Sequence, residues 1–197
     1  MGTIKTVALP MVTVALMASG CGNGYSDATP KPSAYHRIET PDSVFYATEV
    51  KGVEMLLNTE SQIKKETRNG DEWLNIGYPQ FPGSLIHLTL SSTTPEQFSS
   101  MLANREERFK LDVGNVTTEI IELVSDGGWH CAIFVSRSCV TTPIHILASN
   151  PAKTRLLSGI LHINTPENPS ATPDSVSPIV TTYTRDMLTL LKNISEK

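Results

Sequence analysis

Residues 172–194, TPDSVSPIVTTYTRDMLTLLKNI, carry the strongest structural pattern in the chain. Thr172 is a favourable N-cap, Pro173 suits the first helical position, and Asp174 favours the positive end of the helix dipole. Apolar residues then recur every three or four positions and form one stripe: Val176, Val180, Tyr183, Met187, Leu190, Leu191 and Ile194. Because the polar side of this helix is not basic, the stripe indicates packing on a sheet rather than binding at a membrane surface.

The preceding sequence predicts many short strands and one further helix. β-favouring stretches occupy residues 35–39, 44–50, 53–57, 62–67, 73–78, 85–90, 117–124, 129–135, 141–148 and 156–163. Turn-forming residues stand at 69–71, 126–128 and 150–151. A helix is expected at 95–110, with Thr94 as its N-cap and Gln97 completing a capping box. Its apolar side carries Phe98, Met101, Leu102 and Phe109. These elements predict an α+β domain in which helices flank an antiparallel β-sheet.

The N-terminal residues are typical of an exported protein. Lys5 is followed by an apolar stretch that ends in small residues before Cys21. This stretch is shorter than the roughly 20 apolar residues of a membrane-spanning helix. The sequence before Cys21 resembles a bacterial lipobox, which predicts lipidation of that cysteine, and an ordinary secretory signal is the alternative. We expect a signal peptide over 1–20, a lipidated tether over 21–33 and one globular domain over 34–197.

The charge of the chain excludes one class of partner. The formal net charge is −4, and residues 1–20 contribute only the positive charge of Lys5, so the remainder carries −5. Nucleic-acid binding depends on basic contacts to phosphate, so we expect no nucleic-acid partner. No basic cluster would draw the protein to anionic lipid, and membrane attachment is therefore expected through the lipid on Cys21.

Patterns of catalytic residues are absent from the sequence. It contains no glycine-rich phosphate loop, no nucleophile elbow and no two-histidine zinc motif. The five histidines are scattered over predicted strands: His36, His87, His130, His145 and His162. A hydrolase using His130 with Ser136 or Ser138 is the only nucleophile–base hypothesis that the spacing offers. Cys131 and Cys139 are interpreted as buried thiols, with a disulfide as the alternative if the loop between them is long. The sequence thus predicts a protein without catalytic residues, metal or cofactor.

Several segments resemble the gliding-motility lipoproteins of the GldD family. TPKPSAYHRI at 29–38 resembles the start of the family's first strand, and WLNIGYP at 73–79 resembles its Trp-x-Asn-Ile-x-Tyr-Pro segment. The apolar strand at 86–90 follows at the expected place. LSGILHINT at 157–165 resembles a strand ending in Tyr-Phe-Asn, and PDSV at 173–176 then opens the last helix. The likeness preserves order along nearly the whole mature chain.

This resemblance implies a non-catalytic lipoprotein that assists a gliding and protein-secretion machinery in the cell envelope through protein contacts. It also implies an α/β/α sandwich of the Mog1/PsbP kind. The lack of an acidic export tag after Cys21 implies a location on the periplasmic side, at the outer membrane. The family's bacteria O-glycosylate Asp-Ser/Thr-apolar sites, which makes Ser43 a candidate and Ser175 a weaker one.

Two interpretations remain open for how the domain acts. Trp73 and Tyr78 are predicted to form a patch that binds a protein partner. The alternative interpretation is that both are core aromatics. The alternative function is a periplasmic lipoprotein that binds a small ligand or lipid in a cleft of the sandwich.

Overall fold

The computed structural model describes residues 39–114, 116–164 and 171–197. Every described residue belongs to one compact unit. The predicted signal peptide, the tether with Cys21 and most of the strand expected at 35–39 therefore lie outside the described residues.

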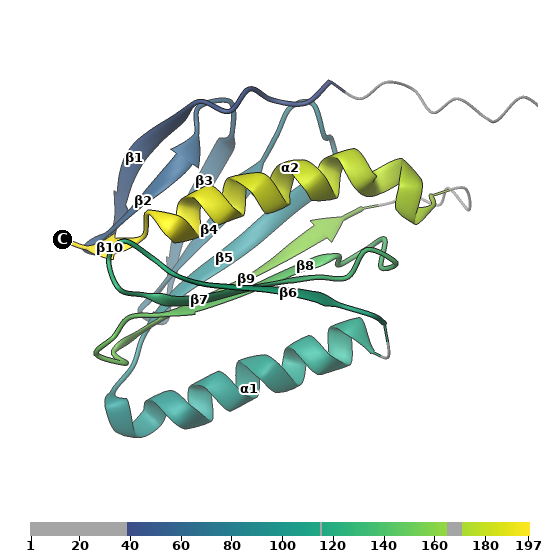
Figure 1. Cartoon of the computed structure of the whole chain (residues 1–197). Coiled ribbons are helices and arrows are strands. Elements are labelled where there is room, and N and C mark those ends of the chain that lie inside the picture. Colours follow the sequence, from purple (N-terminus) through teal and green to yellow (C-terminus); the bar gives the residue numbers. More distant parts are fainter. Residues whose placement is uncertain (1–38, 115, 165–170) are drawn as a thin grey trace, which may run out of the picture. The chain divides into compact units, whose positions relative to one another are not determined.

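A seven-stranded antiparallel sheet forms the centre of the domain (Figure 1). Its strand order is β3-β4-β5-β9-β8-β7-β6, so β9 returns from late in the chain to pair with β5. The strands are β3 (Gln62–Arg68), β4 (Asp71–Gly77), β5 (Ser84–Ser92), β6 (Glu119–Val124), β7 (His130–Val135), β8 (Ile144–Ser149) and β9 (Arg155–Ile163). The turn predicted between β3 and β4 is confirmed: Asn69 and Gly70 both adopt positive φ, as a tight hairpin requires.

A second, three-stranded sheet consists of β1 (Phe45–Val50), β2 (Val53–Asn58) and the short β10 (Ser195–Glu196). The expectation of a single sheet was therefore wrong. β2 pairs with β1 on one side and with the chain's C-terminal residues on the other. The division into two sheets depends on pairing between β2 and β10, which lie about 140 residues apart in the sequence. A local sequence pattern cannot predict such a long-range pairing.

Helix α2 (Pro173–Lys192) covers one face of the seven-stranded sheet and also contacts β2 (Figure 1). The Thr172 side chain accepts a hydrogen bond from the Ser175 backbone N–H, and the Ser175 hydroxyl in turn accepts from the Thr172 backbone. The predicted N-cap is thus confirmed, and Ser175 completes a capping box. All seven residues of the predicted apolar stripe are buried in the main core. Burial of this stripe stabilises α2 far more than its intrinsic helix propensity does.

Helix α1 (Pro95–Val113) lies over the opposite face of the sheet (Figure 1). Thr94 is its N-cap as predicted, but the predicted capping box is wrong because the Thr94 side chain makes no capping hydrogen bond. Phe98 is buried, whereas Met101, Leu102 and Phe109 are only half-buried. A narrow apolar stripe anchors α1 and leaves space between this helix and the sheet.

The turn between β6 and β7 packs closely against the end of α2. The Asp126 N–H donates to the Lys192 carbonyl at 2.9 Å, and the Ser125 hydroxyl donates to the Ile194 carbonyl at 2.8 Å. A Cβ atom on Gly127 would lie only 2.5 Å from the Ile194 carbonyl oxygen. Glycine is required here because the two backbones approach without room for a side chain.

Both described cysteines are free thiols. Cys131 is buried in β7, and burial raises its pKa to about 11. Cys139 is only half-buried, because it lies in the loop before β8. That strand begins at Ile144 rather than at residue 141, so the interpretation of two buried thiols was right for Cys131 and wrong for Cys139.

Candidate functional site

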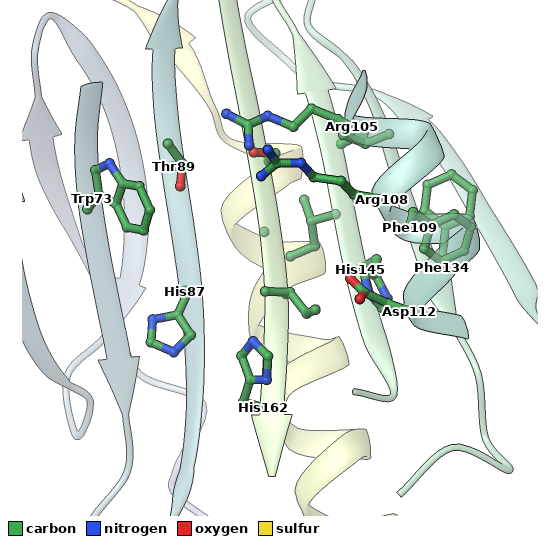
Figure 2. A pocket seen from close by; sticks show the side chains of 15 residues that line it. Trp73, His87, Thr89, Arg105, Arg108, Phe109, Asp112, Phe134, His145 and His162 are labelled. Carbon is green, nitrogen blue, oxygen red and sulfur yellow. The ribbon is translucent and has the colours of Figure 1, made fainter. Parts of the chain in front are cut away.

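The two faces of the seven-stranded sheet differ in polarity. Successive side chains of a strand point to opposite faces, so Leu74, Ile86 and Leu88 enter the core beneath α2. Their neighbours Trp73 and His87 lie on the face beneath α1 (Figure 2). The face covered by α1 is therefore polar as well as incompletely covered, which makes it the candidate functional surface of the domain.

A pocket of about 380 Å³ opens between α1 and this face (Figure 2). Its lining residues come from six elements: Trp73, His87, Thr89, Arg105, Arg108, Phe109, Asp112, Phe134, His145, Ile146, Leu147, Ser158, Gly159, Ile160 and His162. Apolar and aromatic walls with a few polar groups are typical of small-molecule sites, and the volume lies in their usual range.

Two arginines of α1 extend over the pocket. Arg105 and Arg108 are three residues apart and therefore share one side of the helix. Figure 2 shows both guanidinium groups reaching from α1 across the strands toward Thr89. Neither arginine forms an ion pair with any residue that the structure describes.

His145 lies at the bottom of the pocket beside Phe109, with ring centroids 4.7 Å apart. Its side chain is only 6% exposed, and its Nε2 lies 3.6 Å from an Asp112 carboxylate oxygen. Neither ring nitrogen has a hydrogen-bond partner among the described residues. Burial lowers the pKa of His145 and outweighs the opposing effect of Asp112, so the ring is neutral at pH 7 and carries one N–H.

His87 and His162 lie side by side on β5 and β9, with ring centroids 5.2 Å apart (Figure 2). His87 Nδ1 is hydrogen-bonded to the Asn75 side-chain oxygen, so that nitrogen carries the proton when the ring is neutral. Burial lowers the pKa of His87, and the adjacent His162 lowers it further. No group of three or more metal-ligating side chains occurs among the described residues.

The structure separates the two aromatic residues of the predicted contact patch. Trp73 lines the pocket beneath α1, and its buried indole Nε1 has no hydrogen-bond partner among the described residues. Tyr78 is only 4% exposed and packs in the core against Phe81 and Tyr183. The interpretation as a core aromatic is therefore correct for Tyr78, and the two side chains form no common surface.

Tyr78 also takes part in a buried polar network with α2. Its hydroxyl donates to the Asp186 carboxylate, which accepts further bonds from the Asn58 amide at 3.1 Å and from Arg185 Nε at 2.7 Å. Burial raises the pKa of Tyr78, and the hydrogen bond to Asp186 raises it further, so the phenol keeps its proton. Arg185 in turn donates to the Pro41 carbonyl at 3.2 Å. The network links the start of the described chain, β2 and α2.

The residues of the hydrolase hypothesis do not come together. His130 begins β7, whereas Ser136 follows its last residue, so about 20 Å of extended chain separates them. Ser136 is buried, and its hydroxyl lies 2.7 Å from that of Thr118. Ser138 lies in the loop beyond it. The geometry offers no nucleophile–base pair at His130.

The proposed modification sites have different surroundings. Ser43 is exposed, two residues before the start of β1. Ser175 is half-buried, and its hydroxyl donates to the Thr172 carbonyl in the first turn of α2. Cys21 lies outside the described residues.

The two arginines and the pairing of His87 with His162 were not predicted. The spacing of Arg105 and Arg108 is the one sequence signal for a basic side of α1, and Glu106 and Glu107 between them mask it in a linear reading. The histidines are 75 positions apart in the sequence, and only the pairing of β5 with β9 brings them together.

None of the helices that the structure describes is long and apolar enough to span a membrane. No curated protein is found to match the chain. Residues 25–195 match the family described as gliding motility lipoprotein GldD. The match includes both sheets and both helices of the domain, except for the last residue of β10. The chain therefore belongs to the GldD family and is a non-catalytic gliding motility lipoprotein.

Proposed function

We propose that this lipoprotein is anchored through Cys21 on the periplasmic side of the outer membrane and assists the motility and secretion machinery by direct protein contacts. The observation that carries the proposal is the family match over residues 25–195, which includes nearly all of the folded domain. The association with motility machinery follows from the family, and the anchor, the membrane and the mode of contact are the proposed parts.

The domain boundaries belong to the same proposal, with a signal peptide over 1–20, a tether over 21–33 and one domain over 34–197. A flexible tether would let the domain reach partners while the lipid stays in the membrane. Trp73 is the remaining candidate contact residue, since Tyr78 is buried in the core. We also propose that the α+β domain has a Mog1/PsbP-like sandwich fold. The helices on opposite sheet faces support this (Figure 1), and an experimental structure with both helices on one face would contradict it.

Replacing Cys21 with serine is expected to abolish lipidation. Cells grown with labelled palmitate should incorporate the label into the wild-type protein and not into Cys21→Ser, because serine offers no thiol for diacylation. In-cell crosslinking should then recover envelope proteins with the wild-type chain and lose them with Cys21→Ser, since a protein with its acyl chains is held stably at the membrane.

The matched control is Cys139→Ser, which removes a half-buried cysteine of the domain instead. This variant should be labelled and crosslinked like the wild type. Equal labelling of Cys21→Ser and the wild type would contradict the anchor. Equal crosslinking of the two would contradict a role of the anchor in partner contact.

We further propose O-glycosylation at Ser43, in the sequence Asp42-Ser43-Val44. The exposure of Ser43 supports access for a transferase, whereas the Ser175 hydroxyl is engaged in the α2 cap. Intact-mass measurement of protein from the native host should show an added glycan that disappears in Ser43→Ala and persists in Ser175→Ala. A glycan that persists in Ser43→Ala would place the modification elsewhere.

A further inference from the structure

The pocket beneath α1 combines apolar walls with two arginines that form no ion pair with the described residues. Phe109 and Phe134 pack with ring centroids 4.6 Å apart, and Leu147 and Ile160 add aliphatic surface. These side chains come from α1, β7, β8 and β9, so the cavity is a product of the tertiary fold. Such walls favour a ligand with an apolar body, because binding would remove apolar surface from water.

The charged groups of the pocket favour an anion. Arg105 and Arg108 contribute two positive charges, and Asp112 is the only carboxylate among the lining residues. Asp112 lies beside His145, and neither arginine has an ion-pair partner among the described residues. The pocket is thus locally positive in a protein whose net charge is negative. Paired arginines are suited to carboxylate or phosphate because each presents a planar set of donors.

Two side chains that line the pocket also have buried nitrogens without a hydrogen-bond partner among the described residues. The side chain of His145 is 94% buried, and both of its ring nitrogens are without a hydrogen bond within the described part of the chain. The same holds for the Trp73 indole N–H on the other side of the pocket. Buried polar groups in folded proteins are nearly always hydrogen-bonded. Their presence in the wall of a pocket points to acceptor atoms that a ligand brings.

Two hydroxyls lie between these groups. Thr89 on β5 and Ser158 on β9 are directly opposite each other in the strand register and both line the pocket. Arg105 and Arg108 reach toward Thr89 from α1 (Figure 2). An oxyanion at this position would accept hydrogen bonds both from the helix and from the sheet.

We propose that this pocket binds a small amphiphile with an anionic group, a carboxylate or a phosphate, held by Arg105 and Arg108 above Thr89 and Ser158. The apolar part of the ligand packs against the aromatic and aliphatic walls. This site does not depend on the anchor at Cys21, and Trp73 is the one residue of its lining that is also proposed for contact with another protein.

The test uses the full-length lipidated chain in nanodiscs of zwitterionic lipid, with calorimetric titrations corrected by empty discs. Four probes share an eight-carbon chain and differ in the head group: octanoate, octyl phosphate, octanol and octylammonium. We expect an anionic probe to bind roughly tenfold more tightly than octanol, and octylammonium to bind most weakly. A preference for octanoate over octyl phosphate would indicate a fatty-acid-like ligand, and the reverse preference would indicate a phosphate-bearing lipid fragment.

Arg105→Glu and Arg108→Glu should each weaken binding of the preferred anion roughly tenfold or more. Lys110→Glu is the matched control, because it makes the same change of charge on the same helix at an exposed residue outside the pocket. This variant should change the affinity by less than about twofold, since a solvent-exposed charge is screened. Circular dichroism should show unchanged folding in all three variants, because neither Arg105 nor Arg108 forms an ion pair with a described residue and Lys110 is exposed.

Three results would overturn the proposal: octanol binding as tightly as both anions, an equal loss of affinity in Lys110→Glu, or no binding of any probe. Crosslinking of the same arginine variants to envelope proteins is a separate test, because it measures the partner contacts of the proposed function rather than ligand binding. Lost probe binding with retained crosslinking would separate the ligand site from partner contact.

Discussion

Replacing Asp186 with alanine is expected to lower the free energy of unfolding by about 3–5 kcal/mol, as when one member of a buried polar pair is removed. Asp186 is only 2% exposed and accepts hydrogen bonds from Tyr78, Asn58 and Arg185. Without the carboxylate, the tyrosine hydroxyl and the asparagine amide would stay buried with fewer partners. Leaving such groups unsatisfied costs about 1–3 kcal/mol each. Urea unfolding followed by circular dichroism measures the change.

Asp174→Ala is the matched control on the same helix. Asp174 is exposed in the first turn of α2, so its loss removes only a favourable interaction with the helix dipole, worth about 0.3–1 kcal/mol. Asp186→Asn should fall between the two, because the amide retains one acceptor oxygen for the same partners. If Asp186→Ala were as stable as Asp174→Ala, the buried network would not link the start of the described chain, β2 and α2 in the way described.

Replacing Trp129 with alanine is expected to cost a similar amount, about 3–5 kcal/mol, for a different reason. Trp129 is fully buried in the main core, directly before β7. Its removal would leave a cavity that the surrounding strands can fill only in part. The alanine variant keeps the turn before β7, because there the Trp129 backbone N–H donates to the Ser125 hydroxyl at 2.9 Å and its carbonyl accepts from the Ser125 N–H, so the loss reports the indole alone.

The second tryptophan of the chain provides the comparison. Trp73 is half-buried at the pocket, so Trp73→Ala should lower the free energy of unfolding by less than about 2 kcal/mol. Both variants are measured by urea unfolding, with the slope of the transition checked for two-state behaviour. A larger loss in Trp73→Ala than in Trp129→Ala would show that the face beneath α1, rather than the face beneath α2, holds the main core.

Local patterns predicted those elements whose stability depends on neighbours in sequence. The apolar stripe of α2 repeats every three or four residues, and its N-cap uses Thr172 and Ser175. The helix, its first residue and its buried face could therefore all be predicted from the sequence. The β3–β4 hairpin depends on Asn69 and Gly70, which tolerate positive φ. The prediction for α1 was less complete. Its extent was close, but the Thr94 capping geometry and the shallow burial of the helix depend on how it meets the sheet.

The sequence by itself determined the order of β1 to β9, the two helices and the buried face of α2, because these follow from side-chain spacing and turn chemistry over a few residues. Only the tertiary structure decided the division into two sheets. It also decided the burial of Tyr78 against Asp186, which lies 108 positions away in the sequence, and the contact between His87 and His162. It also placed Arg105 and Arg108 over the polar face of the sheet. Strand pairing and helix docking are set by the total burial that the whole chain achieves. The pocket therefore exists only once residues from α1 and five strands have assembled around it.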